Sequence, residues 1–180
     1  MGGGRFLDVA RPLGADSDKD GRGVAIADLD GDGRLDVVIA NNDAPPTIYL
    51  NRLRSVGNWT RLNLRATKGN RDALGAIVRL TVRVGNKLKT MTRQVEAGSS
   101  YASQSEGTIH FGLGRATRIE AIDVVWRKGS QQHFEGPGVD GLVNQAASLD
   151  EGGRITAAKT PTTARTAGPL STGQLREERP

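Results

Sequence analysis

The sequence lacks several features on which common functions depend. It contains no cysteine, which excludes disulfide frameworks, thiolate metal sites and cysteine nucleophiles. It has no run of about 18 apolar residues, the length that a membrane-spanning helix needs. Aromatic residues make up only 4% of the chain, whereas glycine occurs 24 times. This composition favours a turn-rich β protein over a helical one.

The first residues, 1–5, also lack the apolar core of a signal peptide. If the protein is exported, we expect the signal to lie outside this chain. At the other end, residues 153–180 are rich in threonine, alanine, glycine, proline and charge. They offer too little apolar surface to offset the entropy of ordering them, so we expect a disordered tail.

Charge is distributed unevenly along the 180 residues, whose net charge is +5. Residues 1–57 hold 7 Lys and Arg against 9 Asp and Glu, whereas residues 58–150 hold 13 against 8. A basic excess admits an anionic partner. The charges of the second segment are dispersed along strand-like stretches, which favours a solvated surface. A weak nucleic-acid binder is a further alternative, although the segment shows no aromatic platform or basic helix.

The acidic residues of the first segment concentrate in residues 28–36, Asp-Leu-Asp-Gly-Asp-Gly-Arg-Leu-Asp. Four carboxylates this close together repel one another unless a cation lies among them. Oxygen ligands without nearby cysteine or histidine suit Ca²⁺ better than zinc. Calcium loops place side-chain ligands at positions 1, 3 and 5 and a main-chain carbonyl at position 7. With the acid at position 9, the sequence predicts a Ca²⁺ site formed by Asp28, Asp30, Asp32, the carbonyl of Arg34, and Asp36.

The segments that flank this loop are typical of strands rather than of EF-hand helices. Residues 24–27 and 35–40 are short apolar runs rich in β-branched side chains and bounded by turn residues. Position 12, where an EF-hand supplies its last carboxylate, is Ile39. We therefore predict a metal loop that joins two strands. Asp- and Gly-rich turns without a metal also occur between strands and are the alternative.

Together with its surroundings, the loop resembles an FG-GAP/VCBS repeat, a calcium-binding blade of integrin-type β-propellers. Besides the loop, the resemblance rests on residues 21–25, Asn41-Asn42, Pro45-Pro46 and residues 49–51. The Phe-Gly-Gly-Ala-Pro signature of the repeat is absent. With two further strands expected at residues 6–10 and 47–51, these segments predict one four-stranded blade over residues 5–57.

From residue 58 the pattern changes to alternating strands with turns between them. The alternation at residues 108–113 places Ile109, Phe111 and Leu113 on the inward face and His110 on the opposite one. The other expected strands are residues 59–64, 76–84, 88–95, 119–126 and an edge strand at 132–134. We predict an all-β chain, whose second part, residues 58–152, is a small antiparallel β-sandwich-like domain.

This second part resembles the ASPIC/UnbV domain. After Asn58-Trp59, the stretches 69–76, 97–105 and 110–114 follow in the order of that family. The Trp-Arg-Lys-Gly segment 126–129 corresponds to the family's Trp-Pro-Ser-Gly turn without its proline. The domain follows FG-GAP/VCBS repeats in the cartilage acidic protein family. The resemblance implies a secreted, cell-surface or periplasmic calcium-binding protein that acts as an adhesion or interaction module on a protein or glycan surface.

One blade cannot close a propeller, because repeat units need about three or more neighbours to bury a continuous core. We expect either that the chain is the C-terminal portion of a longer propeller protein or that its blade docks on the second domain. The sequence indicates no oligomeric state.

A haloacid dehalogenase-like phosphatase is the enzymatic alternative, because residues 24–31 also resemble the start of that family. Asp28 would be the nucleophile and Asp30 the acid/base, with Mg²⁺ bridging the phosphate. Asp32 replaces the usual threonine, and a strand rather than a helix is expected to follow. Neither His110 nor His133 belongs to a recognisable nucleophile arrangement. We therefore expect no enzymatic activity.

Overall fold

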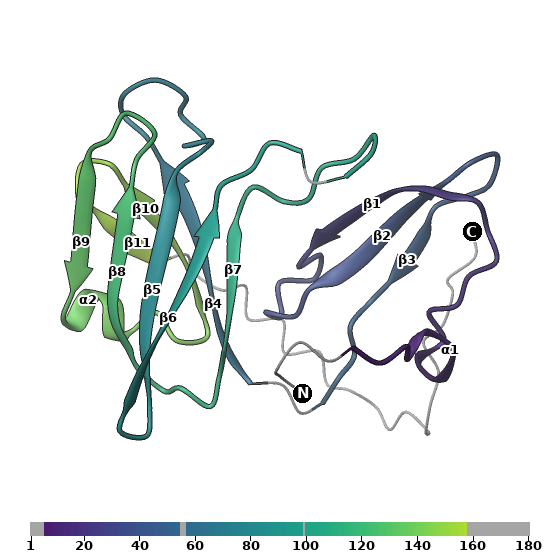
Figure 1. Ribbon diagram of the computed structural model, residues 1–180, viewed down its shortest axis with the longest axis horizontal. Helices are drawn as coiled ribbons and strands as arrows, with labels where there is room; N and C mark the ends of the chain where they lie inside the picture. The colour runs from purple at the N-terminus through teal and green to yellow at the C-terminus, as the bar shows by residue number, and fades with distance from the viewer. Residues whose placement is uncertain (1–5, 55–56, 99, 158–180) are drawn as a thin grey trace.

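The computed structural model describes residues 6–54, 57–98 and 100–157, which form a mostly β protein (Figure 1). A three-stranded sheet, called here the N-terminal sheet, stands beside two four-stranded sheets that form a sandwich. The predicted fold class is confirmed. Two four-residue helices were not predicted, α1 (Ala10–Leu13) and α2 (Pro137–Asp140).

The N-terminal sheet is antiparallel, with the order β1 (Gly21–Ala27), β2 (Asp36–Asn41) and β3 (Thr47–Tyr49). These three strands were predicted. The prediction of a strand at residues 6–10 is wrong, because the chain there leads into α1. This helix ends at Gly14, which has a left-handed conformation. Pro12 lacks the N–H that a β ladder needs but is tolerated in a first helical turn.

The free edge of β1 is occupied instead by residues 100–106 of the second part, called here the docking segment. Ser103 Oγ donates to the carbonyl of Val24 at 2.7 Å, and Glu106 N donates to the carbonyl of Ile26 at 3.2 Å. The amide of Ile26 donates to Ser105 Oγ at 3.1 Å. Figure 1 shows this segment reaching from the sandwich toward β1. The predicted fourth strand is thus replaced by an irregular segment from the other side of the interface.

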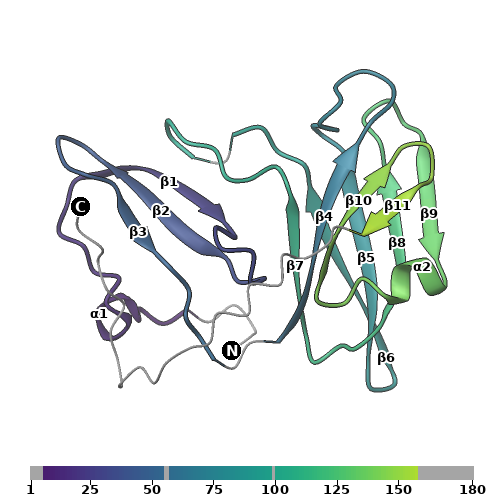
Figure 2. The ribbon, with the colours of Figure 1, turned by 180° about the vertical axis from the view of Figure 1, so that it is seen from behind.

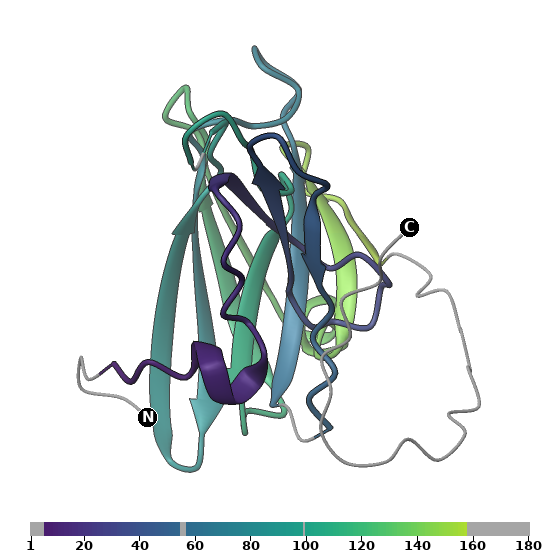
Figure 3. The same cartoon turned by 90° about the vertical axis from the view of Figure 1, so that its right-hand side faces the viewer.

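The sandwich consists of two sheets with the orders β11-β10-β4-β7 and β6-β5-β8-β9. Figure 2 shows β10 and β11 in front of β5 and β8, and Figure 3 shows the N-terminal sheet in front of the sandwich. The strands are β4 (Asn58–Arg65), β5 (Ile77–Val84), β6 (Lys87–Gln94), β7 (Ile109–Gly114), β8 (Ile119–Val125), β9 (Gln131–Glu135), β10 (Gln145–Asp150) and β11 (Ile155–Ala157).

The core lies between these two sheets and follows the predicted alternation. Ile109, Phe111 and Leu113 are buried on β7, as expected. They pack in one cluster with the inward residues of the other sheet, among them Val78 and Leu80 of β5. His110 lies on the opposite face of β7, as predicted, and the structure places it against the acidic end of the N-terminal sheet.

Two strands of the sandwich were missed. β10 carries two alanines and a serine with Leu149 as its single large apolar residue, so its alternation is weak. It pairs with β4 in parallel, after the chain has crossed between the sheets through α2, so the sandwich is not purely antiparallel. β11 pairs with β10 at Ile155–Ala157, within the segment expected to be a disordered tail. Residues 158–180 of that expected tail lie outside the described residues.

Candidate metal site at the contact between the two parts

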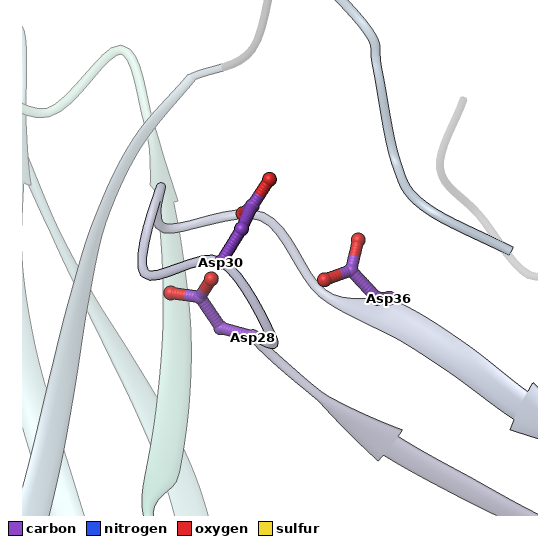
Figure 4. A group of neighbouring side chains, drawn as sticks. All are labelled: Asp28, Asp30 and Asp36. Carbon is purple, nitrogen blue, oxygen red and sulfur yellow. The ribbon is translucent and has the colours of Figure 1, made fainter. Parts of the chain in front are cut away.

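The predicted metal residues lie in the loop that joins β1 to β2, called here the acidic loop (residues 28–36). One carboxylate oxygen from each of Asp28, Asp30 and Asp36 lies within 4.8 Å of the others. Figure 4 shows Asp36, at the start of β2, pointing back toward the part of the loop that carries Asp28 and Asp30. Two oxygens that each lie about 2.4 Å from one Ca²⁺ can be at most about 4.8 Å apart. This donor set therefore fits a hard divalent cation.

The acidic loop is held in shape by its own main chain. Asp28 is buried and accepts hydrogen bonds from the amides of Asp32 at 3.0 Å and Gly33 at 2.9 Å. Gly33 has φ of 85°, a left-handed conformation that favours glycine. Asp36 is also buried and accepts from the amides of Leu29 at 2.9 Å and Asn51 at 2.7 Å. Both ends of the loop are thereby fixed with their carboxylates facing inward.

Arginine side chains also neutralise this cluster, a feature that sequence reasoning missed. Arg52 Nη1 lies 2.7 Å from Asp30 Oδ2, and Arg61 Nη1 lies 2.6 Å from Asp28 Oδ2. Each of these two guanidinium groups competes with a metal for a carboxylate oxygen. The mutual repulsion from which a cation was inferred is therefore partly relieved by the protein itself.

Asp32 and Arg34 are placed differently from the other three predicted metal residues. The carboxylate of Asp32 forms an ion pair with the guanidinium group of Arg34 and is not a member of the three-carboxylate cluster. Burial raises the pKa of Asp32, and the hydrogen bond from the Arg34 amide opposes that shift. Arg34 Nε also donates to the carbonyl of Asn51 at 2.7 Å. The roles of Asp32 and of the Arg34 carbonyl as ligands remain predictions.

The sandwich packs directly on the acidic loop through an aromatic pair. The rings of Trp59 and His110 are stacked, with centroids 6.2 Å apart and planes 12° from parallel. His110 Nε2 lies 2.9 Å from the carbonyl oxygen of Gly33. A Cβ atom placed on Gly33 would lie only 1.9 Å from the Trp59 ring, so this contact requires glycine.

An ion-pair bridge lies beside the aromatic pair. Arg61 Nη2 lies 2.9 Å from Glu106 Oε2, while its Nη1 holds Asp28 as described above. Glu106 Oε1 in turn accepts from the amide of Asp28 at 3.4 Å. The Asp28 side chain has no exposed surface and that of Arg61 is 17% exposed. The bridge therefore connects the acidic loop, β4 and the docking segment in a largely water-excluded place.

The sequence did not predict the contacts that these interface residues make. Arg61 occupies a strand position in β4, and Glu106 follows a serine-rich stretch between two expected strands. The single usable signal was the placement of His110 on the outward face of β7. The acidic loop continues into β2 rather than into a helix, which removes one feature of the phosphatase alternative.

The chain has an acidic loop between two strands, followed by a β-sandwich, and two known protein families match these two parts in the same order. The FG-GAP repeat family matches residues 21–51, and the ASPIC and UnbV family matches residues 66–152. The chain thus carries an FG-GAP repeat followed by an ASPIC/UnbV domain, as its motifs predicted. Both matched families are non-enzymatic in kind.

Cartilage acidic protein 1 is similar to this chain in three vertebrates. The Xenopus tropicalis protein is 33% identical over 130 residues, which are 69% of this chain and 19% of the relative. The Mus musculus protein is 30% identical over 112 residues, 61% of this chain and 17% of the relative. The Homo sapiens protein is 29% identical over 112 residues, 61% of this chain and 16% of the relative. The chain therefore spans less than a fifth of the length of these relatives.

Proposed function

We propose that the chain is a calcium-binding part of an extracellular adhesion or interaction protein, without enzymatic activity of its own. The observation that carries the proposal is the convergence of Asp28, Asp30 and Asp36 within the reach of a single ion. This cluster lies in the segment that matches the FG-GAP repeat. Calcium would supply two positive charges to a group of carboxylates that protein cations neutralise only in part.

In this proposal the carboxylates of Asp28, Asp30 and Asp36 hold the metal. Asp32 and the carbonyl of Arg34 complete the predicted ligand set at loop positions 5 and 7. His110 and Trp59 contact Gly33 inside the same loop. A metal that rigidifies this loop therefore also braces the contact between the N-terminal sheet and the sandwich. This bracing presents the two parts as one surface to a protein or glycan partner.

The proposed location follows from the same comparisons. The FG-GAP match and the cartilage acidic protein relatives support a secreted, cell-surface or periplasmic protein. Extracellular calcium modules commonly bind with dissociation constants of about 10⁻⁴ to 10⁻³ M, which keeps them filled outside cells. Among the described residues, no helix has the length and apolar character needed to cross a membrane. In this proposal the chain is the C-terminal portion of a longer propeller protein, and the aligned stretch makes up less than a fifth of each of these relatives.

Titration calorimetry with Ca²⁺ and with Mg²⁺ tests this function. We expect saturable Ca²⁺ binding with a dissociation constant of about 1 mM or below, and weaker Mg²⁺ binding because Mg²⁺ demands a stricter geometry. Asp30→Ala should abolish the Ca²⁺ signal. Asp18→Ala is the matched control, because Asp18 is exposed and lies outside the acidic loop.

Equal and weak heats for both metals and for all three proteins would overturn the assignment. Rapid hydrolysis of p-nitrophenyl phosphate that Asp28→Asn abolishes would replace it with the phosphatase alternative. Both measurements use the full chain.

A further inference from the structure

A second site is suggested by a cavity at the end of the sandwich that carries no acidic-loop residue. Its volume is about 230 Å³. It lies between the connection from β4 to β5 (residues 66–76) and the turn from β8 to β9 (residues 126–130), which stand at the same end of the sandwich in Figure 1. Both loops belong to the motifs that resemble the ASPIC/UnbV family. The metal proposal uses neither of them.

Three exposed cations line this cavity, namely Lys68, Arg127 and Lys128. No ion pair joins any of them to a carboxylate among the described residues. A Cβ atom on Gly69 would lie 3.4 Å from Lys128 Cε, so the lysine stem lies against the neighbouring loop. The cavity is therefore lined by three positive charges that no ion pair neutralises in the described part of the chain, and the stem of Lys128 is held beside it by the neighbouring loop.

The acidic residue of the lining, Glu151, cancels only part of this charge, because it carries one negative charge against three cations. Its Oε2 accepts hydrogen bonds from the amides of Thr67 at 2.8 Å and Lys68 at 3.0 Å and from Thr67 Oγ1 at 3.1 Å. Its Oε1 accepts from Ser130 Oγ at 2.9 Å. The hydroxyl of Ser130, followed by these other donors, lowers the pKa of Glu151 to about 2. Glu151 is thus an ionised acceptor, and Oε1 retains room for one more donor.

These features define the kind of ligand that would fit. The cations require an anionic group, whereas Glu151 Oε1 and the amide of Asn70 suit a ligand that also carries hydroxyl groups. Ala73 and Leu74 supply apolar surface. The volume of about 230 Å³ lies below the roughly 300–1,000 Å³ of pockets for drug-sized ligands, which favours one small ring. We propose that this cavity binds a single acidic sugar unit, either a uronate or a sulfated sugar.

This binding goes beyond the proposed function and does not require calcium. It would provide a contact to an acidic glycan on the face of the sandwich formed by the two loops. The uronate carboxylate or the sulfate would lie near Lys68 and Lys128, with the ring hydroxyls toward Glu151 and Asn70. A neutral sugar lacks the anionic group, and an acidic peptide lacks the hydroxyl groups.

The experiment is a ¹H–¹⁵N NMR titration of the full chain with glucuronate and glucose 6-sulfate, repeated in EDTA. We expect shifts at the amides of Lys68, Asn70 and Lys128 that saturate with either acidic sugar and persist without metal. Glucose, inorganic sulfate and a tetraglutamate peptide are the comparison probes. The proposal predicts at least about threefold weaker binding for each of them, the loss expected for one partly exposed charged or polar contact.

Variants test the residues directly. Lys128→Gln should weaken binding of the acidic sugars about three- to fivefold, as expected for one partly exposed ion pair. Lys87→Gln is the matched control, because it removes an exposed lysine at the start of β6. Glucose, sulfate or the peptide binding as well as the acidic sugars would overturn the proposal, as would unchanged affinity in a folded Lys128→Gln protein. Because the EDTA arm contains no calcium, failure of calcium binding and failure of this site are distinguishable.

Discussion

The N-terminal sheet and the sandwich are stabilised by different kinds of contact. Every buried apolar side chain in the described part of the chain belongs to the sandwich, beginning with Leu62. The buried polar side chains of the N-terminal sheet and its loop are Asp28, Asp36 and Thr47, while Val24 and Ile26 are 38% and 40% exposed. A sheet of three strands with so little buried apolar surface is marginal alone. It depends on polar contacts and on its attachment to the sandwich.

The contacts that attach the N-terminal sheet to the sandwich are accordingly polar and include one close steric fit. The docking segment supplies hydrogen bonds to β1, and Arg61 supplies a charge to Asp28. Trp59 covers Gly33 without leaving space for a Cβ atom. The FG-GAP repeat and the ASPIC/UnbV domain are therefore linked by specific contacts and not only by the chain that joins them. The N-terminal sheet is thus docked on the second domain, which is one of the two arrangements expected for a single blade.

The largest expected effect comes from the sandwich core. Leu80→Ala removes a fully buried side chain of β5 and should lower the free energy of unfolding by about 2–5 kcal/mol, through lost burial and a residual cavity. Both parts should lose stability, because the N-terminal sheet relies on the sandwich. Thermal and urea denaturation measure the change. Loss of protection from hydrogen exchange in the sandwich alone would contradict the dependence inferred here.

The next effect comes from the ion-pair bridge. Arg61→Met leaves the carboxylates of Asp28 and Glu106 without their cation and should destabilise the docked arrangement by about 2–3 kcal/mol, somewhat less than for a fully buried pair. Hydrogen exchange should increase in β1 and in the docking segment while β5 and β8 stay protected. Arg79→Met, an exposed change on β5, is the control. Uniformly faster exchange throughout the chain would argue against a local role.

Calcium removal should have a smaller and equally local effect. With a dissociation constant of about 1 mM, 10 mM Ca²⁺ would stabilise the native state by about 1.4 kcal/mol, which EDTA removes. We expect a lower melting temperature in EDTA and faster exchange in the acidic loop. Asp30→Ala should show no such difference between calcium and EDTA. A calcium response of equal size in that variant would place the ion elsewhere.

The smallest effects are pH-dependent and belong to the sandwich surface. The hydrogen bond that His133 donates to Asp123, followed by the one that it donates to Glu135, raises the pKa of His133 above 6.5. This contribution to stability is present below pH 6.5 and is lost as the pH rises through the raised pKa of the folded state. His133→Gln should therefore flatten the dependence of the melting temperature on pH above 6.5. An unchanged slope would mean that this exposed cluster contributes nothing measurable.

Glu151 should act in the opposite direction. Its pKa falls from 4.5 to about 2, so its contribution is present above pH 4.5 and is lost as the pH falls toward 2. Glu151→Gln should reduce the loss of stability between these two values. A melting curve measured at several acidic pH values checks this expectation. Identical acid sensitivity of variant and wild type would refute it.

Local pattern was sufficient for most strands and for the acidic loop. The alternation of Ile109, Phe111 and Leu113 identified β7 and its inward face, because a strand buried on one face must alternate. The same reasoning failed at residues 6–10, where Phe6 is 95% exposed and no strand pairs with the segment. It also missed β10, whose parallel pairing with β4 joins residues about 85 positions apart. Because apolar and polar residues alternate only weakly along β10, no local pattern indicated its pairing with β4.

By itself, the sequence determined the carboxylate chemistry of the acidic loop and its order along the chain, because Asp28, Asp30, Asp32 and Asp36 lie within nine residues and two glycines allow the loop to turn. Only the tertiary structure decided what surrounds them. Arg61 reaches Asp28 across 33 positions and His110 reaches Gly33 across 77. Contacts over such separations depend on the packing of whole sheets, which leaves no local pattern in the residues that form them.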